Sequence, residues 1–594
     1  MLSLSKQNKL LSLQNTDILT LIFHFPQTNK KKNIVEDIMK KSFLLFILAL
    51  CSIALFAQNE DWLWAKQAGG TSNDYGRSIA VDDNGNSYVT GDFAESATFG
   101  TTTLTSSGYD DIYVAKMDSN GNWLWAKQAG GTNYDYGYGI AVDAYGNSYV
   151  TGYFKSSSCS FGTITLINNN SEFIDIFAAK LDSNGNWLWA KQAGGIYMDY
   201  GYSIAVDING NSYITGSFED SANFGTTTLD SSSKYYSDIF VAKLDSNGNW
   251  LWAKQAGGTD DDGGSSIAVD ANGNSYVTGV FAESATFGTT TLTSSDGYDI
   301  FVAKLDSNGN WLWAKRAGGI YEDSGYSIAV DDNGNSYITG FFNISATFGT
   351  TTLTSSGYYD IFVAKLDSSG NWLWAKQAGG TIWDTGYSIA IDDNGNSYIT
   401  GVFAESATFC TTTLTSSGDY DIFVAKLDSS GNWLWAKQAG GTSTDRGYSI
   451  AVDVNGNSYV TGYFEESATF GATTITSIND DGREIFVAKL GEVNSIDLPD
   501  IISFSGIRSI YPNPFNPLTT IDYEISMPAD VKIEVYNNRG QLVRNFILGY
   551  KEQGSYKLTW EGEDNNGCLC STGIYYIRMK AGKEIYIKKA VLLK

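Results

Sequence analysis

The sequence predicts an all-β protein, a seven-bladed β-propeller followed by a small Ig-like β-sandwich. One observation is an internal repeat of 61 to 64 residues that is marked by the pentapeptide WLWAK. Another is a change after Leu490, where the repeats give way to a proline-rich segment and a new set of short strands. The pentapeptide begins at Trp62, Trp123, Trp187, Trp250, Trp311, Trp372 and Trp433.

Each repeat predicts four strands with the sequences SIAVD, SYVTG, IFVAKLD and WLWAK or close variants. Asn-Gly pairs such as Asn84-Gly85 and Asn184-Gly185 lie between the strands and supply the positive φ angles of tight hairpins. No proline occurs from Gln58 to Leu490, as expected for strands that need every ladder donor. A sheet with two partly apolar faces needs neighbouring sheets on both sides, which favours radial stacking.

The ends of the repeat region predict a closed ring. The seventh repeat ends at residues 485–490 without a following WLWAK, whereas the first WLWAK, residues 62–66, has no preceding IFVAKLD. Pairing these two strands would complete the seventh blade and remove the exposed edges of an open array. An open β-solenoid is the alternative.

The paired tryptophans are expected to pack between blades. Strand alternation places Trp372 and Trp374 on one side and Leu373 on the other. A carbohydrate platform would also use tryptophan, but regular repetition at one strand position favours burial.

Composition excludes several function classes. The chain has 594 residues and a formal net charge of −26, which opposes binding to nucleic acids and to anionic membranes. Its single histidine, His24, precedes the folded repeats, so most hydrolytic triads have no base. Glycosidase chemistry needs a carboxylate pair unlike its symmetry mates, and the sequence shows none, so we predict no enzyme.

The N-terminal region predicts export. Two lysines after Met39 precede an apolar stretch from Phe43 to Ala57, which is typical of a secretory signal peptide over residues 39–57. This stretch is too short for a permanent membrane span, so none is expected after cleavage. Residues 1–38 are interpreted as a non-native or disordered extension, and lipidation at Cys51 is an alternative. The other four cysteines are expected to be free or buried thiols.

The segments that follow the AGG motif are predicted to surround one mouth of the central channel. Every repeat has an aspartate there, and its neighbours vary more than the rest of the repeat. The aspartates fit two roles, structural capping of the loop or contact with a glycan or protein ligand, and both stay open. The candidate ligand residues are Asp74, Asp135, Asp199, Asp262, Asp323, Asp384, Asp445, Tyr134, Tyr136, Tyr197, Tyr321 and Trp383.

The D-x-N-G-N turns, such as residues 331–335, partly match calcium loops but lack the glutamate at the twelfth position. Simple hairpin geometry is therefore the preferred interpretation. We predict no cofactor and no metal site, with calcium at these turns as the alternative.

The C-terminal part predicts a second domain. We place the propeller at residues 58–490, a linker at 491–509 and the Ig-like domain at 510–594. Three prolines within residues 512–517 indicate an extended entry, and short alternating strands such as TTIDYEI and GIYYIRMKAG follow.

Residues 61–490 resemble the SBBP family, the β-propeller repeat of bacterial secreted proteins, through units such as GNWLWAKQAGG and GYSIAVDDNGNSYITG. The C-terminal domain resembles the type A sorting domain of bacterial type IX secretion through NNRGQLV (537–543), STGIYY (571–576), a basic end and a sorting motif. That motif is Tyr511, Pro512, Asn513, Pro514, Phe515, Asn516 and Pro517.

The resemblance implies an export machinery as partner and a location that is secreted or on the outer-membrane surface of a Gram-negative bacterium. An Ig-like module that merely spaces the propeller is the alternative. We expect a monomeric, non-enzymatic binding or adhesion protein. A purely structural envelope or matrix protein is the second possibility, and a carbohydrate-active enzyme is the third.

Overall fold

A computed structural model describes residues 60–168, 170, 172–478, 482–492, 505–552, 554–582 and 584–593. All regular elements in these residues are β-strands, which form two compact units, and no helix among them could span a membrane. The predicted signal peptide, residues 1–38, Cys51 and His24 lie outside the described residues.

The larger unit contains seven blades, each built on four antiparallel strands. In blades one to six these strands follow one another in sequence from the inner to the outer position. The four strands of each predicted repeat are confirmed. The first three blades consist of β2 (Asp74–Val81), β3 (Ser87–Phe99), β4 (Thr102–Met117) and β5 (Trp123–Ala129); β6 (Asp135–Val142), β7 (Ser148–Phe154), β10 (Asp175–Leu181) and β11 (Trp187–Gly195); and β12 (Asp199–Val206), β13 (Ser212–Glu219), β16 (Ser237–Leu244) and β17 (Trp250–Ala256).

Blades four to six repeat this order. They consist of β18 (Gly263–Val269), β19 (Ser275–Phe287), β20 (Thr290–Leu305) and β21 (Trp311–Ala317); β22 (Ser324–Val330), β23 (Ser336–Phe348), β24 (Thr351–Leu366) and β25 (Trp372–Ala378); and β26 (Thr385–Ile391), β27 (Ser397–Phe403), β30 (Asp421–Leu427) and β31 (Trp433–Ala439).

A hairpin arm lies between the second and third strands of each blade. In blades one, four and five the arm continues these strands, and in the other blades it forms a strand pair of its own. The arm of blade three also pairs with the outer strand of blade two. These pairs are β8 (Ser158–Phe161) with β9 (Ile164–Ile167), β14 (Ser221–Phe224) with β15 (Thr227–Asp230), β28 (Ser406–Phe409) with β29 (Thr412–Thr415), and β34 (Ser467–Phe470) with β35 (Thr473–Thr476).

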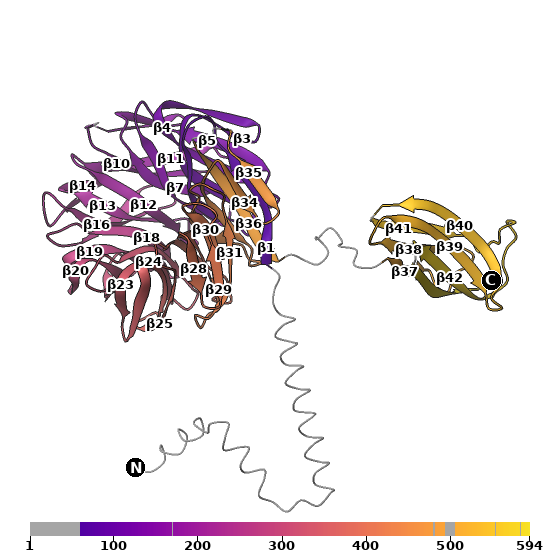
Figure 1. The fold of residues 1–594 in the computed structure, drawn as a ribbon. Coiled ribbons are helices and arrows are strands. Elements are labelled where there is room, and N and C mark those ends of the chain that lie inside the picture. Colours follow the sequence, from indigo (N-terminus) through magenta and orange to yellow (C-terminus); the bar gives the residue numbers. More distant parts are fainter. Residues whose placement is uncertain are drawn as a thin grey trace, which may run out of the picture. The chain divides into compact units, whose positions relative to one another are not determined.

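The seventh blade joins the two ends of the repeat region, as predicted. It contains β32 (Arg446–Val452), β33 (Ser458–Glu465), β36 (Arg483–Glu492) and the first strand of the unit, β1 (Glu60–Ala68). Strand β1 pairs antiparallel with β36 from Glu60 opposite Glu492 to Ala68 opposite Ile485. Figure 1 shows the indigo strand β1 beside the orange strand β36. The ring is therefore closed.

A buried ion pair lies beside this closure. The Glu60 carboxylate is 3.0 Å from the Lys426 amine, and the two side chains are 4 % and 8 % exposed. Lys426 belongs to blade six, whereas Glu60 opens the outer strand of blade seven. The pair thus joins the closing strand to the blade next to it.

The apolar core lies between blades. Seven clusters of buried residues each combine side chains of two neighbouring sheets. One example joins Tyr337 and Ile361 of blade five to Phe403 and Phe423 of blade six. No blade covers both of its own faces, so each depends on its neighbours for burial.

The predicted packing of the tryptophans is confirmed, but their predicted common side is wrong. Leu366 pairs with Trp372 and Lys365 with Trp374, so Leu373 is the extra residue of a β-bulge. The bulge turns Trp372 toward the core between blades four and five, and Trp374 toward the core between blades five and six. Leu373 is left exposed.

Hydrogen bonds from blade to blade also join the inner strands. The Ile389 amide donates to the Ser327 hydroxyl of the preceding blade at 3.2 Å, and five further isoleucine and serine pairs repeat this bond. The position corresponding to Ser327 in blade two is Gly139, which has no hydroxyl to offer.

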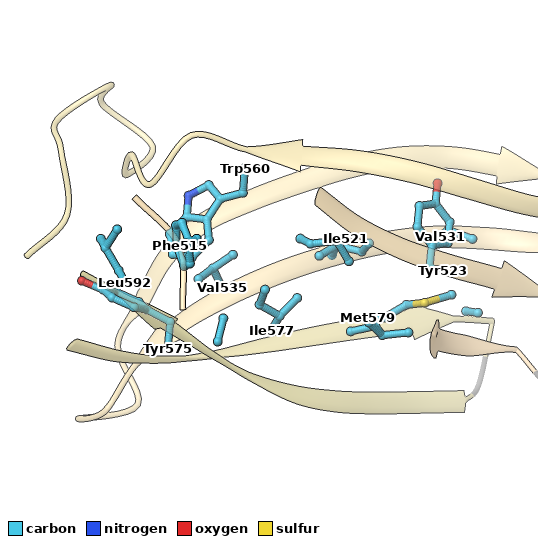
Figure 2. Packing of buried hydrophobic residues seen from close by; sticks show 14 of the residues in the cluster. Phe515, Ile521, Tyr523, Val531, Val535, Trp560, Tyr575, Ile577, Met579 and Leu592 are labelled. Carbon is cyan, nitrogen blue, oxygen red and sulfur yellow. The ribbon is translucent and has the colours of Figure 1, made fainter. Parts of the chain in front are cut away.

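The smaller unit is a sandwich of two antiparallel sheets, which confirms the Ig-like prediction. One sheet contains β37 (Gly506–Tyr511), β38 (Thr519–Ile525) and β41 (Gly554–Trp560); the other contains β40 (Leu542–Lys551), β39 (Ala529–Asn537), β42 (Gly573–Ala581) and β43 (Glu584–Leu592). Figure 2 shows Ile521, Val535, Ile577 and Trp560 in the core of this sandwich.

Two strands of the sandwich were not expected from the sequence. Strand β37 begins at Gly506, inside the stretch assigned to the linker, and pairs with β38. Its alternation is short, which explains why it looked like linker sequence. Strand β40 pairs with β39, and most of its side chains are only half-buried, so it lacks a clear apolar pattern.

Candidate functional site

The seven predicted aspartates lie at the start of the inner strands and are buried. Each is at most 1 % exposed. Asp384 is typical, since one carboxylate oxygen accepts the Gly380 amide at 2.6 Å and the other accepts the Ala404 amide at 3.2 Å. These contacts support the capping interpretation. Direct contact of the aspartates with a ligand stays a prediction.

Each of these aspartates has a second buried carboxyl group nearby. Asp360 precedes Ile361 of β24 and faces Asp384 across Gly379. A Cβ atom added at Gly379 would lie 2.7 Å from Asp360 Oδ1 and 3.1 Å from Asp384 Oδ2, so only glycine fits between them. The corresponding pairs in the other blades are Asp74 with Glu484, Asp135 with Asp111, Asp199 with Asp175, Asp262 with Asp238, Asp323 with Asp299 and Asp445 with Asp421.

Burial and mutual repulsion favour the protonated form in these pairs. Burial raises the pKa of Asp384 to about 7, and the charge of Asp360 adds to this increase. Burial also raises the pKa of Asp360 to about 6. Hydrogen bonds from backbone amides act in the opposite direction but do not cancel the effect of burial.

Four of the five predicted aromatic residues pack on aromatic neighbours near this end of the ring. Tyr134 stacks on Tyr109 with ring centroids 4.8 Å apart, and Trp383 packs on Tyr359 at 5.3 Å. Tyr197 packs on Phe173, and Tyr136 donates to Asp110 at 2.8 Å. Tyr134, Tyr321 and Trp383 remain exposed, so these three are available to a ligand.

A second set of aromatic residues was missed by the sequence analysis. Three positions after the capping aspartate, five blades carry a tyrosine on the inner strand, one carries arginine and one carries serine. We call these residues the tyrosine ring; they are Arg77, Tyr138, Tyr202, Ser265, Tyr326, Tyr387 and Tyr448. Neighbouring members touch, as in Tyr387 with Tyr448 at 5.4 Å and Tyr138 with Tyr202 at 5.8 Å.

Blade one differs from the others at this ring. The Arg77 guanidinium forms an ion pair with buried Asp92 on β3 and lies 4.6 Å from the ring centroid of Tyr138. Burial disfavours the charged arginine, but Asp92 and the tyrosines outweigh it, so the pKa of Arg77 lies above its ordinary value. A comparison of the repeats could have found this pair, because Arg77 and Asp92 are both unusual at their repeat positions.

The expectation that no carboxylate pair departs from the repeat is wrong. Asp92 and Asp110 line one cavity of about 510 Å³, together with Tyr75 and Tyr136. No other blade has an acidic residue at either position; blade seven, for example, has Tyr463 and Arg483 there. The two aspartates are 18 positions apart in sequence and come together only because β3 pairs with β4.

Blade four opens a second and less symmetric space. A cavity of about 570 Å³ lies at the mouth and borders the tyrosine ring. The cavity is wider at blade four, because Gly263 and Ser265 occupy positions at which several other blades have tyrosine. We call this part the blade-four notch; it is lined by Ser217, Ser237, Asp261, Gly263, Ser265, Val280 and Tyr298.

The D-x-N-G-N turns lie at the opposite end of the blades, and their carboxylates serve the turn itself. Asp331 accepts the amides of Asn333 and Asn335, at 3.0 and 2.9 Å, and also the Asn335 side-chain amide and the Tyr337 hydroxyl. Hairpin geometry therefore accounts for these residues. Calcium binding at the turns stays an untested alternative.

The buried acid pairs predict a stability that falls as pH rises. In the unfolded chain these carboxyl groups ionise near pH 4, and in the folded chain Asp360 and Asp384 ionise near pH 6 and 7. Their contribution is complete below about pH 4 and is lost up to about pH 7. Asp360→Asn should therefore raise the unfolding free energy by about 1 kcal/mol or more at pH 8, and by less at pH 5.

Urea unfolding at the two pH values measures this difference. Asp332→Asn is the control, because Asp332 is exposed in a turn at the other end of blade five. An equal effect of Asp360→Asn at both pH values would contradict the shared burial of the pair.

Comparison with known families assigns both units. The β-propeller repeat model SBBP matches residues 63–92, 124–153, 188–217, 251–280, 312–340, 373–402 and 434–463. The FlgD Ig-like domain model matches residues 517–584. The finer assignment of this second unit as a type IX sorting domain stays a prediction.

Two curated proteins are similar to parts of the chain. An uncharacterized WD repeat-containing protein of Acanthamoeba polyphaga mimivirus is 25 % identical over 535 residues, which is 72 % of this chain and 38 % of that protein. Regulatory protein FlaEY of Caulobacter vibrioides is 31 % identical over 139 residues, 23 % of this chain and 14 % of that protein. The chain thus spans well under half the length of these relatives.

Two solved structures show low similarity to the chain. A fungal alcohol oxidase has a TM-score of 0.39 and 12 % identity, with 90 % of this chain and all of that chain covered. A puromycin hydrolase has a TM-score of 0.37 and 11 % identity, with 79 % and 60 % covered. The repeat and domain matches are therefore the informative ones: the chain contains seven SBBP β-propeller repeats followed by a FlgD Ig-like domain.

Proposed function

We propose that the propeller is a non-enzymatic binding module that holds its ligand at the mouth bordered by the tyrosine ring. The observation that carries this proposal is the uneven mouth. Five tyrosines surround the channel. Blade four has Ser265 at the corresponding position, and Gly263 and Val280 lie beside it in the same cavity. A cavity of about 570 Å³ is within the range of ordinary ligand pockets, about 300–1,000 Å³.

The side chains at the mouth suit recognition. Tyrosine offers a rigid apolar ring and a hydroxyl, so it can pack on a sugar ring or a peptide side chain and hydrogen-bond at the same time. The ring members support one another by contact, for example Tyr326 with Tyr387 at 5.6 Å. A supported ring loses little conformational freedom when a ligand arrives.

Two other functions are less well supported by this geometry. A purely structural propeller needs only the repeated cores and has no use for a mouth that differs in one blade. Catalysis by Asp92 and Asp110 is disfavoured because Arg77 neutralises the first and the Tyr136 hydroxyl donates to the second. We therefore propose binding rather than an enzymatic reaction.

We further propose that the protein acts outside the cell and that its C-terminal domain directs export. The support is the signal-peptide pattern of residues 39–57 and the resemblance of the C-terminal motifs to type IX sorting domains. In the folded domain Phe515 of the sorting motif is buried against Trp560, with ring centroids 5.2 Å apart. The rest of the motif is mostly exposed, which suits contact with an export machinery.

Filling the blade-four notch should weaken ligand binding. Ser265→Tyr restores the residue of five other blades and places a large ring in the cavity, so a ligand found by glycan and peptide arrays should bind at least about tenfold more weakly. Ser369→Tyr is the control, because Ser369 is exposed in the turn before β25, at the other end of the blades. Arrays without any binding, or equal binding by both variants, would favour the structural alternative.

Removal of residues 511–594 should keep the propeller inside the producing cell. The fold supports this test because the sandwich and the propeller have separate cores. Immunoblots of cell and medium fractions measure the distribution. Propeller that still reaches the medium or cell surface would overturn the sorting role and leave the spacer interpretation.

A further inference from the structure

We propose that the blade-four notch binds a cationic side chain, a guanidinium or an ammonium group, presented by a peptide or protein partner. This inference deepens the proposed function and rests on it, since it names the chemistry of the ligand at the same mouth. The protein binds its own arginines in a similar way elsewhere at this mouth.

Arg77 provides an internal example of cation binding at the mouth. Its guanidinium carbon lies 4.6 Å from the ring centroid of Tyr138 and 5.1 Å from that of Tyr75, and its charge is paired with Asp92. Aromatic faces and one carboxylate together form a typical cation-binding site. The mouth of the propeller therefore already binds one guanidinium group, that of Arg77 in blade one.

Arg483 repeats this arrangement, and Arg446 uses the tyrosines alone. Arg483 forms an ion pair with Glu465 at 2.8 Å, donates to the Tyr75 hydroxyl at 2.8 Å and lies 4.8 Å from the Tyr463 ring centroid. Arg446 donates to the Tyr387 hydroxyl at 3.1 Å. All three arginines belong to blades one and seven.

The blade-four notch has similar receptor groups, and Arg77 of blade one lines another part of the same cavity. Tyr202, Tyr298 and Tyr326 line the cavity next to the notch, and Asp261 supplies a carboxylate. The position that Arg77 occupies in blade one is held here by Ser265, so the volume of the arginine side chain is left open. Among the described residues, no lysine or arginine forms an ion pair with Asp261.

Asp261 is held in place by its neighbours. One carboxylate oxygen accepts both the amide and the hydroxyl of Ser237, at 2.9 and 3.1 Å. Burial raises the pKa of Tyr298, and the charges of Asp261, Asp260 and Glu322 raise it further, which places these acids near one hydroxyl at the notch. The local field therefore favours a positive group and opposes an anion.

The shape of the notch fits a long basic side chain. Val280 and the tyrosine faces offer apolar contact for the methylene groups of lysine or arginine, while the charged end reaches Asp261. The net charge of −26 also attracts basic partners from a distance. A peptide is favoured over a free amino acid because the mouth is open and its exposed aromatic rim, including Trp383, can contact the rest of a chain.

Isothermal titration of the purified full chain at low ionic strength tests this inference. The probes are acetyl-Gly-Arg-Gly-amide, its lysine counterpart and the citrulline counterpart, which keeps the shape of arginine but carries no charge. The arginine and lysine peptides should bind at least about tenfold more tightly than the citrulline peptide. Asp261→Asn should remove most of that difference, and Asp83→Asn, an exposed change at the other end of blade one, should leave it intact.

The outcomes separate this inference from the function on which it rests. Equal binding of the arginine and citrulline peptides, or unchanged preference in Asp261→Asn, overturns the cation site. If an array ligand is still lost in Ser265→Tyr in that case, the mouth remains a binding site for a ligand of other chemistry. If the charge preference is present and Ser265→Tyr removes it, both proposals are supported together.

Discussion

Mutual burial of neighbouring blades is the interaction on which the structure depends. Every apolar cluster of the propeller is shared by two sheets, so no sheet buries its apolar faces without both of its neighbours. An array with two ends would leave two faces and two edges exposed. Pairing of β1 with β36 removes both problems, and the Glu60 and Lys426 ion pair lies at the same junction.

This closed scaffold separates positions that must stay constant from positions that are free to vary. The capping aspartates, the glycine between the acid pairs and the bulged tryptophans recur because each one supports the contact between strands or blades. The inner-strand residues of the tyrosine ring line the channel instead. Chemical differences therefore gather at the mouth, with arginines in blades one and seven and an open notch in blade four.

Much of the fold was predictable because its determinants are local. The Asn-Gly turns and the repeat period define the strands, and the missing and surplus strands at the two ends predict closure. The tryptophan orientation was not predictable from alternation, because one bulged residue reverses the side to which the next side chains point. Strand β40 was missed since its half-buried side chains give no clear pattern.

The site was less predictable for the same reason, since it depends on contacts between distant residues. Capping by Asp384 involves an amide 20 positions away, and its partner Asp360 belongs to a different strand. In the sequence Tyr387 is one residue of a β-rich segment. Its place in the tyrosine ring follows only from the arrangement of the inner strands around the channel. Arg77 and Asp92 could have been found by comparing the repeats. Both differ from the residues at the same positions in other blades, and two such differences within one blade indicate that the side chains are in contact.

Hydrogen exchange of the backbone amides tests the closed ring most directly. The amides of β1 that bond to β36 should exchange as slowly as those of β25 that bond to β24, because both strands occupy the same place in their sheets. Fast exchange over residues 62–68, with slow exchange in β25, would show that the first strand does not complete the last blade.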